Sequence, residues 1–299
     1  MEKPKVIVIV GPTASGKTSL SIELAKQING EIISCDSMQI YKYMDIGTAK
    51  PTLEEQQGVQ HYMIDIISPE ERFSVSDYQA EAEKAIEEIL AKGKTPIVVG
   101  GTGLYVNSLI YGIKFLDVEF NEEYRRKLEQ RVEQEGLEVL YEEAKQIDPQ
   151  AMESISKNDQ KRILRVLEIF HQTGMTKTKQ DELSRSGELK YDYKVFGINI
   201  EREILYERIN ARVDEMLQKG LVNEVEEIYN KFDKFPTAMQ GIGYKEVVQY
   251  LQNNLSEQEM IEKIKMESRR YAKRQLTWFR KNKDIIWLDG LEDRQNNIK

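Results

Sequence analysis

Cysteine and histidine are scarce in this chain. Its 299 residues include one cysteine, Cys35, and two histidines, His61 and His171. A single cysteine excludes an internal disulfide and is typical of a reducing compartment. Structural zinc sites draw most of their ligands from several cysteines and histidines, so these three residues do not support such a site.

Long apolar runs and an excess of positive charge are also missing. No run is long enough to span a bilayer, and residues 1–4 lead directly into a short apolar segment. The sequence therefore predicts no signal peptide, no membrane segment and a cytoplasmic location. The formal net charge of −8 argues against a protein that coats nucleic acid over its whole surface. A local basic face remains possible, because the field near a site depends on the charges around it.

The clearest motif present is a phosphate-binding loop. Residues 11–18, GPTASGKT, match G-x-x-x-x-G-K-[ST] between an apolar run at 6–10 and a helical pattern at 18–28. Glycines let successive backbone N–H groups converge on one anion, and the following helix adds the positive end of its dipole. The lysine adds a full charge, and the final hydroxyl can bind Mg²⁺. The sequence predicts a site for pyrophosphate or a nucleotide polyphosphate made of Gly11, Pro12, Thr13, Ala14, Ser15, Gly16, Lys17 and Thr18.

A carboxylate follows the second expected strand. Residues 31–35 form that strand, and Asp36 comes directly after it. The strand–helix–strand order favours a parallel sheet, in which such a residue lies beside the phosphate loop. Asp36 could accept a proton or hold a metal ion there. It could also simply cap the next turn, and the local sequence leaves both interpretations open.

The expected strand at 96–100 departs from ordinary ATPases. Those usually end a central strand in an aspartate that binds Mg²⁺. This strand ends in Gly100 and Gly101, so a backbone or a ligand is expected to come very close. Thr102 either caps the helix expected at 104–110 or donates to a ligand.

The middle of the chain changes in character. Charged helical segments are expected at 121–135, 137–146 and 159–172, with a polar loop at 176–190. The sequence predicts an α/β fold, a P-loop NTPase-like parallel sheet flanked by helices, with an all-helical insertion domain. The expected domains are a P-loop catalytic core, 1–116 and 193–299, and the insertion, 117–192.

Two later helices carry basic residues. The helix expected at 203–219 places Arg208 and Arg212 on one face, either for function or as a surface salt-bridge ladder. The helix expected at 257–283 has no acid from 268 to 283, and its aromatic residues alternate with basic ones. This pattern suits a phosphate backbone with unstacked bases. Its buried stripe is expected to be Ile261, Ile264, Tyr271 and Trp278.

These residues support three interpretations: a small-molecule kinase, an enzyme that modifies RNA, and a nucleotide-dependent switch. The missing Mg²⁺-binding aspartate counts against the kinase and the switch, because both act on a γ-phosphate through that metal. Asp36 beside the loop favours an enzyme that needs a base.

Several segments together resemble one family. GPTASGKT, DSMQIYKYMDIGTAKP, GGTGLY, NDQKRILRVLE, RINARVDEMLQKGLVNEV and AKRQLTWFR occur in the order found in tRNA dimethylallyltransferases and cover nearly the whole chain. Two departures are small: Tyr43 stands where a glycine is common, and Tyr62 where a histidine is common. The C-terminal zinc finger of eukaryotic members is missing, so the chain looks like the bacterial form.

The resemblance implies transfer of a dimethylallyl group from dimethylallyl pyrophosphate to N6 of adenine 37 in tRNA, with Mg²⁺ as cofactor. It implies that Asp36 is the base and that Lys17, Thr18 and Arg212 neutralise the departing pyrophosphate. A monomer whose insertion closes on the anticodon stem-loop is expected, and the alternative remains a P-loop kinase. The predicted tRNA contacts are Asp36, Ser37, Met38, Gln39, Thr102, Arg125, Gln160, Lys161, Arg162, Ile163 and Leu164, together with Arg274 and Arg280 of the basic helix.

Overall fold

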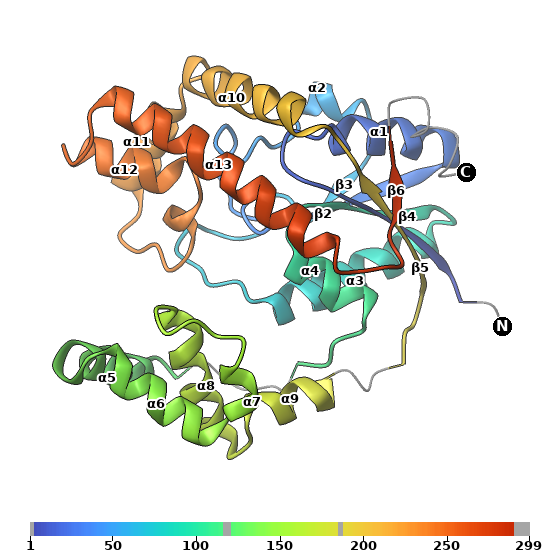
Figure 1. Cartoon of the computed structure of the whole chain (residues 1–299). Coiled ribbons are helices and arrows are strands. Elements are labelled where there is room, and N and C mark those ends of the chain that lie inside the picture. The colour runs from blue at the N-terminus through green and yellow to red at the C-terminus, as the bar shows by residue number, and fades with distance from the viewer. Residues whose placement is uncertain (1–2, 116–120, 185–187, 290–299) are drawn as a thin grey trace. The chain divides into compact units, whose positions relative to one another are not determined.

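The computed structural model describes residues 3–115, 121–184 and 188–289 (Figure 1). Contacts divide the chain into two compact units. The core unit comprises Met1–Ile110 and Leu189–Lys299, and the insertion unit comprises Tyr111–Glu188. The sequence placed the insertion at 117–192.

The core unit is built on a parallel sheet. Its strand order is β3-β2-β4-β1-β5-β6, and every pairing is parallel. The predicted α/β class is thus confirmed. The strands are β1 (Lys5–Val10), β2 (Gly30–Cys35), β3 (His61–Tyr62), β4 (Thr95–Gly100), β5 (Asp192–Ile198) and β6 (Ile286–Leu288). Strand β3 ends at Tyr62, and Ile67 farther along the chain forms only an isolated bridge with Tyr41.

The register brings the carboxyl ends of the central strands to one edge. Gly100 pairs with both Val10 and Cys35, and Val10 also pairs with Gly197. The segments that follow β1, β2 and β4 therefore start side by side. This edge is where open parallel sheets place their ligands.

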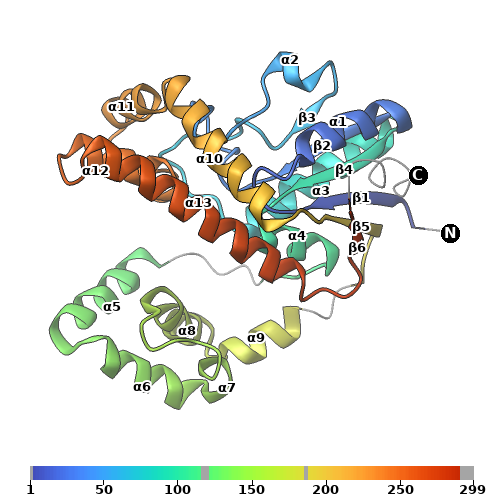
Figure 2. The same cartoon turned by 45° about the horizontal axis from the view of Figure 1, so that its top comes forward.

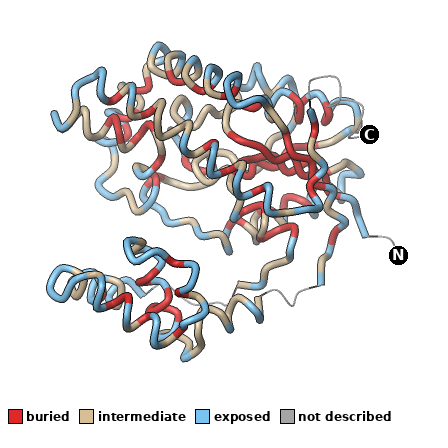
Figure 3. The backbone as a smooth tube through the Cα atoms, viewed as in Figure 1, coloured by how far each residue is buried: buried red, intermediate tan, exposed pale blue. Residues whose placement is uncertain are grey.

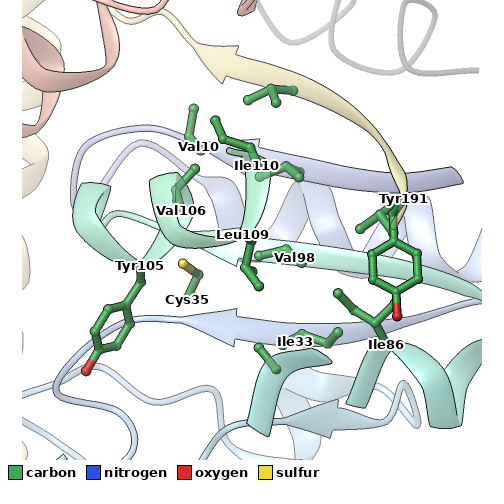
Figure 4. Close-up of a cluster of buried hydrophobic side chains, with 14 of the residues drawn as sticks. Val10, Ile33, Cys35, Ile86, Val98, Tyr105, Val106, Leu109, Ile110 and Tyr191 are labelled. Carbon is green, nitrogen blue, oxygen red and sulfur yellow. The ribbon is translucent and has the colours of Figure 1, made fainter. Parts of the chain in front are cut away.

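Apolar side chains alternate between the two faces of the sheet because successive residues of a strand point in opposite directions. Val6, Val8 and Val10 pack with helices α3 (Val75–Ala91) and α4 (Gly103–Ile110), as Figure 4 shows in part. Ile7 and Ile9 pack on the other face with α1 (Lys17–Ile28). Strands buried on both faces explain the nearly continuous apolar runs in the sequence.

A short helix and a group of longer ones complete the core unit. Helix α2 (Leu53–Gln56) lies in the connection between β2 and β3, and a capping box between Thr52 and Glu55 stabilises its N-terminus. Helices α10 and α13 run alongside each other in Figures 1 and 2 and are in contact. The longer elements are α10 (Arg202–Gln218), α11 (Leu221–Lys231), the 3₁₀ turn Ala238–Gln240, α12 (Tyr244–Leu251) and α13 (Glu257–Phe279).

The buried stripe of α13 differs from the prediction at its end. Ile264 is buried, but Trp278 is 38% exposed and Phe279 is buried instead. The helix ends at Phe279, before the expected residue 283. Phe279 joins the cluster beneath the sheet, and this packing fixes the rotation of the last turn.

The described residues of the insertion unit form helices and no strand, as predicted. This unit has its own cluster of buried hydrophobic residues, which is red in the insertion unit in Figure 3. The polar loop expected at 176–190 contains a helix, α9, because Asp148 accepts hydrogen bonds from the backbone and hydroxyl of Thr178, both at 2.7 Å. The helices are α5 (Glu122–Glu135), α6 (Leu137–Ile147), α7 (Pro149–Met152), α8 (Gln160–Thr173) and α9 (Lys177–Ser184).

Candidate active site

The phosphate loop leaves β1 and turns sharply into α1. Ala14 and Gly16 have φ angles of 60° and 87°, in the left-handed region that favours glycine. The Ser15 hydroxyl is fully buried and, among the described residues, has no hydrogen-bond partner. A buried hydroxyl without a partner is costly, so this group suits a ligand oxygen.

Lys17 lies within the loop as the motif predicts. Its ammonium donates a hydrogen bond to the carbonyl oxygen of Pro12 at 2.6 Å. Burial, with a further effect from the charge of Arg212, lowers the pKa of Lys17 to about 7, while the Asp36 carboxylate opposes the shift. An anion in the loop would supply the counter-charge that this lysine needs.

Helix α10 brings Arg212 to the same loop. Its guanidinium donates to the Thr13 hydroxyl at 3.4 Å. Burial lowers the pKa of Arg212, whereas the negative charges of Glu215 and Asp36 act in the opposite direction. Arg208, one turn earlier, is exposed. Of the two arginines on this helix, Arg212 is therefore the one beside the loop.

Asp36 follows β2 at the same edge of the sheet. One carboxylate oxygen, Oδ1, accepts a hydrogen bond from the backbone N–H of Met38 at 2.9 Å. Asp36 also lines a cavity that reaches the phosphate loop. Asp36 can cap the turn and still act in the cavity, because its carboxylate has a second oxygen that is available to a ligand.

Two cavities meet at Arg212. The first, here the Asp36 cavity, has a volume of about 340 Å³ and is lined by residues that follow β2 and by residues of α10 and α13. The second, here the Thr18 cavity, has a volume of about 380 Å³ and shares Ala49, Arg212 and Met216 with the first. Apolar lining of the Asp36 cavity comes from Met38, Ile209, Val213, Met216, Ile242 and Ile264.

The glycines after β4 have protein neighbours. A Cβ at Gly100 would lie 2.0 Å from the carbonyl oxygen of Cys35, and one at Gly101 would lie 2.0 Å from the amide nitrogen of Gln275. The close approach predicted from the sequence is thus made by β2 and by a side chain of α13.

Gln275 is a residue that the sequence analysis missed. Its Oε1 accepts from the backbone N–H of Thr13 at 2.9 Å, and its Nε2 donates to the carbonyl oxygen of Gly101, also at 2.9 Å. The side chain is 5% exposed. A neutral amide four residues after Tyr271, on the buried face of a basic helix, was the signal that could have revealed it.

Thr102 contacts the segment after β2. Its hydroxyl accepts a hydrogen bond from the backbone N–H of Ser37 at 3.0 Å. It also interacts with the hydroxyl of Tyr271, whose pKa is raised to about 12 by burial and by the charge of Asp36. Tyr271, predicted only as a core residue, therefore lines the cavity together with Asp36, while Thr102 contacts the Tyr271 hydroxyl.

Gln39, predicted to contact RNA, is occupied within the protein. Its Oε1 accepts from the Ser34 hydroxyl at 2.8 Å, and its Nε2 donates to the carbonyl oxygens of Thr48 and Ala49, both at 3.3 Å. This side chain supports a loop within the protein, and its direct contact with RNA stays a prediction. By contrast, Ser37 and Met38 both line the Asp36 cavity.

Within the insertion unit, some of the residues predicted to contact RNA are exposed and others are buried. Lys161 and Arg162 are exposed at the start of α8. Ile163 and Leu164 are fully buried in the core of that unit, so their side chains cannot contact RNA in this arrangement. Their burial follows from the periodicity of α8, because each side chain points along a fixed direction of the helix.

Arg125 is held by carboxylates of its own unit. It forms ion pairs with Glu168 at 2.9 Å and Glu129 at 3.1 Å. It also lines a hollow of about 540 Å³ with Gln160 and Lys161. Two predicted RNA contacts, Gln160 and Lys161, are thus adjacent to a fixed cation.

The basic helix contributes exposed cations to the core unit. Arg274 lines the Asp36 cavity, with its guanidinium 5.7 Å from the centre of the Tyr271 ring. Arg280 is exposed at the end of α13. Trp278 packs where Gly103 has no side chain, since a Cβ there would lie 2.3 Å from the indole.

Comparison with known proteins identifies the family. A family described as IPP transferase matches residues 39–282. The chain belongs to this family. A tRNA dimethylallyltransferase from Acetivibrio thermocellus is 53% identical over 285 residues, 95% of this chain and 91% of the relative. One from Bacillus anthracis is 48% identical over 289 residues, 97% of this chain and 92% of the relative.

Solved structures of family members share the fold. A tRNA isopentenylpyrophosphate transferase from Bacillus halodurans matches with a TM-score of 0.73 and 44% identity, over 99% of this chain and 94% of that one. A eukaryotic dimethylallyltransferase, described as acting on tRNA, matches with a TM-score of 0.78 and 33% identity, over 96% of this chain and 74% of that one.

The described residues contain neither a membrane-spanning helix nor a cluster of metal-binding side chains. No helix is both long and apolar enough to cross a bilayer. In the described ranges, no group of three or more histidine, cysteine, aspartate or glutamate side chains is arranged to hold a metal ion.

Proposed function

We propose that this chain transfers a dimethylallyl group from dimethylallyl pyrophosphate to N6 of adenine 37 in tRNA. The observation that carries the proposal is the meeting of a phosphate loop, Arg212 and Asp36 at one cavity in a member of this family. In the reaction the N6–C1 bond forms and the C1–oxygen bond to pyrophosphate breaks. Pyrophosphate leaves with the electron pair of that bond.

The phosphate loop and Arg212 form the donor side. The Ser15 hydroxyl, Lys17 and Arg212 face a position where negative charge grows as pyrophosphate departs. Preorganised donors at such a position lower the barrier more than they stabilise the ground state.

The residues present fit a magnesium ion. Mg²⁺ commonly takes only one or two protein ligands and completes its shell with phosphate oxygens and water. Thr18 is exposed to its cavity at the start of α1, so its hydroxyl would supply a ligand. When bound, the ion would neutralise part of the pyrophosphate charge.

Asp36, Thr102 and Tyr271 form the acceptor side. Asp36 takes the proton of the adenine N6 as the new bond forms, because an exocyclic amine is a poor nucleophile on its own. Tyr271 lines the cavity with Asp36 and would offer its hydroxyl to the edge of the base, and Thr102 holds that hydroxyl. The adenine must leave its stack to enter the cavity.

The RNA would be held by cations in both units. Arg274 lines the acceptor cavity, and Arg280 lies at the end of the same helix. Lys161 and Arg162 are exposed in the insertion unit, which we propose binds the anticodon stem-loop. We propose a monomer as the active form.

Product analysis tests this function directly. The chain is incubated with labelled dimethylallyl pyrophosphate, Mg²⁺ and an unmodified anticodon stem-loop carrying A36-A37-A38. We expect prenylated adenosine in the digested RNA without any ATP, because β4 ends in glycines rather than in the aspartate of an ATPase. Product formation that strictly requires ATP would favour the kinase alternative instead.

A further inference from the structure

Glu224 on α11 holds a loop that lies far away in the sequence. Its Oε2 accepts hydrogen bonds from the backbone N–H groups of Asp45 at 2.9 Å and Ile46 at 2.6 Å. Its Oε1 accepts from the backbone N–H of Gly47 at 3.0 Å and from the hydroxyl of Tyr244 at 2.6 Å. One carboxylate thus gathers three consecutive amides and a phenol.

Gly47 makes this arrangement possible. A Cβ at this position would lie 2.4 Å from the ring of Tyr244. The ring therefore packs directly against the backbone of the loop while its hydroxyl reaches Glu224. Bonds to a charged acceptor are shorter and stronger than those between neutral groups.

The rest of the loop is fixed by other side chains. Gln39 donates to the carbonyl oxygens of Thr48 and Ala49. Lys50, nearly fully buried, donates to the carbonyl oxygen of Tyr41 at 2.6 Å. These contacts come from the neighbouring sequence, whereas Glu224 ties residues 45–47 to the C-terminal helices by hydrogen bonds to their backbone.

The loop at 45–49 is a wall of both cavities. Gly47, Thr48 and Ala49 line the Asp36 cavity, and Asp45, Ile46 and Ala49 line the Thr18 cavity. A shift of this loop would change the shape of both cavities at Arg212. Because this wall lines the cavities in which both substrates would bind, its displacement should weaken the binding of ground state and transition state alike, which raises KM.

We propose that Glu224 is a positioning residue of the transferase. It fixes the 45–49 wall so that the two substrates meet in a defined geometry, with Tyr244 holding the carboxylate in place. The proposal rests on the proposed function, because it assigns the two cavities to the reaction.

Glu224→Gln is the first test. An amide has one acceptor oxygen and cannot serve all four donors. We expect amide hydrogen exchange to rise at residues 45–49 while the melting temperature changes by only a few degrees. We expect kcat/KM to fall about 10- to 100-fold, mainly through a higher KM for dimethylallyl pyrophosphate. The matched control is Glu227→Gln, an exposed acid on the same helix, which should behave like wild type.

The split between KM and kcat separates positioning from general stability. A variant that merely unfolds in part contains fewer active molecules, so its apparent kcat falls while KM stays constant. An unchanged KM with normal exchange at 45–49 would overturn the proposal, and so would increased exchange spread over the whole core unit.

Two further variants keep the test decisive should Glu224→Gln fail to fold. Tyr244→Phe removes one donor and leaves three, so a smaller rise in KM is expected. Gly47→Ala forces the Tyr244 ring away and should reproduce the KM change without touching Glu224. Combined with Tyr244→Phe, its effect should be less than additive, because both act on one contact. Wild-type chain that fails to prenylate RNA would refute the function, whereas the exchange pattern at 45–49 would still report on the loop.

Discussion

At the scale of single residues, one substitution of Asp36 can distinguish a role as catalytic base from a role as turn cap. Asp36→Asn keeps the oxygen that accepts from Met38, so the turn and the melting temperature should be preserved. It removes the proton acceptor, so the chemical step should slow by roughly 10²–10⁴-fold. Rapid-quench single turnover measures that step, while filter binding checks that RNA affinity is little changed. Prenylation at near wild-type rate by the Asn variant would show that Asp36 only caps the turn.

Lys17 should couple donor binding to proton uptake. Its pKa is about 7 in the free protein, against an ordinary value of 10.5, mainly because of burial. An anion in the loop raises that pKa, so binding should take up protons between about pH 7 and 10, and affinity should weaken as pH rises through this window. Calorimetry of pyrophosphate binding in two buffers of different ionisation enthalpy measures the uptake. Lys17→Met gives the baseline, and equal uptake by both proteins would contradict this role.

The lowered pKa of Lys17 also affects how the free energy of unfolding changes with pH. Because the folded-state pKa of Lys17 lies below its unfolded value, the unfolded chain binds more protons between about pH 7 and 10. The contribution of this residue to the stability of the ligand-free protein therefore increases as pH rises through that window. A bound anion should weaken this pH dependence, because it raises the folded-state pKa of Lys17 toward the unfolded value.

Arg212 and Arg208 form a natural pair of variants on one helix. Arg212→Ala removes a guanidinium that contacts Thr13 of the phosphate loop, so turnover should fall about 10²–10³-fold. Arg208→Ala removes an exposed arginine one turn away and should leave turnover unchanged. Single-turnover rates under saturating substrate compare the two. The assignment is wrong should Arg208→Ala be the more damaging change.

At the scale of elements, α13 has two faces with different tasks. Its buried face carries Phe279 into the sheet cluster and Gln275 to the phosphate loop. Arg274 and Arg280 are exposed on the same helix, Arg280 at its C-terminal end. One helix can therefore fix the donor site while offering cations to RNA.

The exposed face of α13 should govern the salt dependence of RNA binding. Replacing Arg274 and Arg280 by Ala removes two phosphate contacts, so the slope of log affinity against log salt should shrink by roughly 1.5–2. The control replaces Lys26 and Lys84, two exposed lysines on α1 and α3, which alters net charge equally. Filter binding over a salt series gives the slopes. Equal slopes for the two double variants would show that Arg274 and Arg280 are ordinary solvent-exposed residues that do not contact RNA phosphates.

At the scale of the whole molecule, the two units have separate hydrophobic cores. The insertion unit packs around its own cluster, and the sheet and C-terminal helices pack around others. The chain enters and leaves the insertion at neighbouring points, since the backbone N–H of Lys114 donates to the carbonyl oxygen of Ser184 at 2.8 Å.

This arrangement predicts that the insertion can be removed. Replacing residues 115–184 by a short Gly/Ser linker should leave a folded core, because the linker joins adjacent ends. Pyrophosphate affinity should stay within a few-fold of wild type, and stem-loop affinity should fall by an order of magnitude or more. Calorimetry and filter binding measure the two. Unchanged RNA affinity would show that the insertion does not bind the stem-loop.

The sequence alone determined the local chemistry of this protein. The phosphate loop, the parallel sheet and the helices of the insertion follow from short motifs and from periodicity, because these depend on neighbours in the chain. Gly100 and Gly101 likewise indicated that other groups pack closely against the end of β4, although not that these groups are Cys35 and Gln275. The resemblance of whole segments to one family then gave the function, which local spacing had left open.

Only the tertiary structure decided which distant groups meet. Gln275 reaches Thr13 across 262 residues, and Glu224 reaches Ile46 across 178. Their partners are backbone amides, which every residue but proline carries, so no side-chain pattern marks them in the sequence. Packing also decided that Phe279 rather than Trp278 is buried, because the choice depends on what lies against the helix. Short sequence motifs thus determine which functional groups the site contains. The positions of these groups depend on long-range contacts that form only when the chain folds.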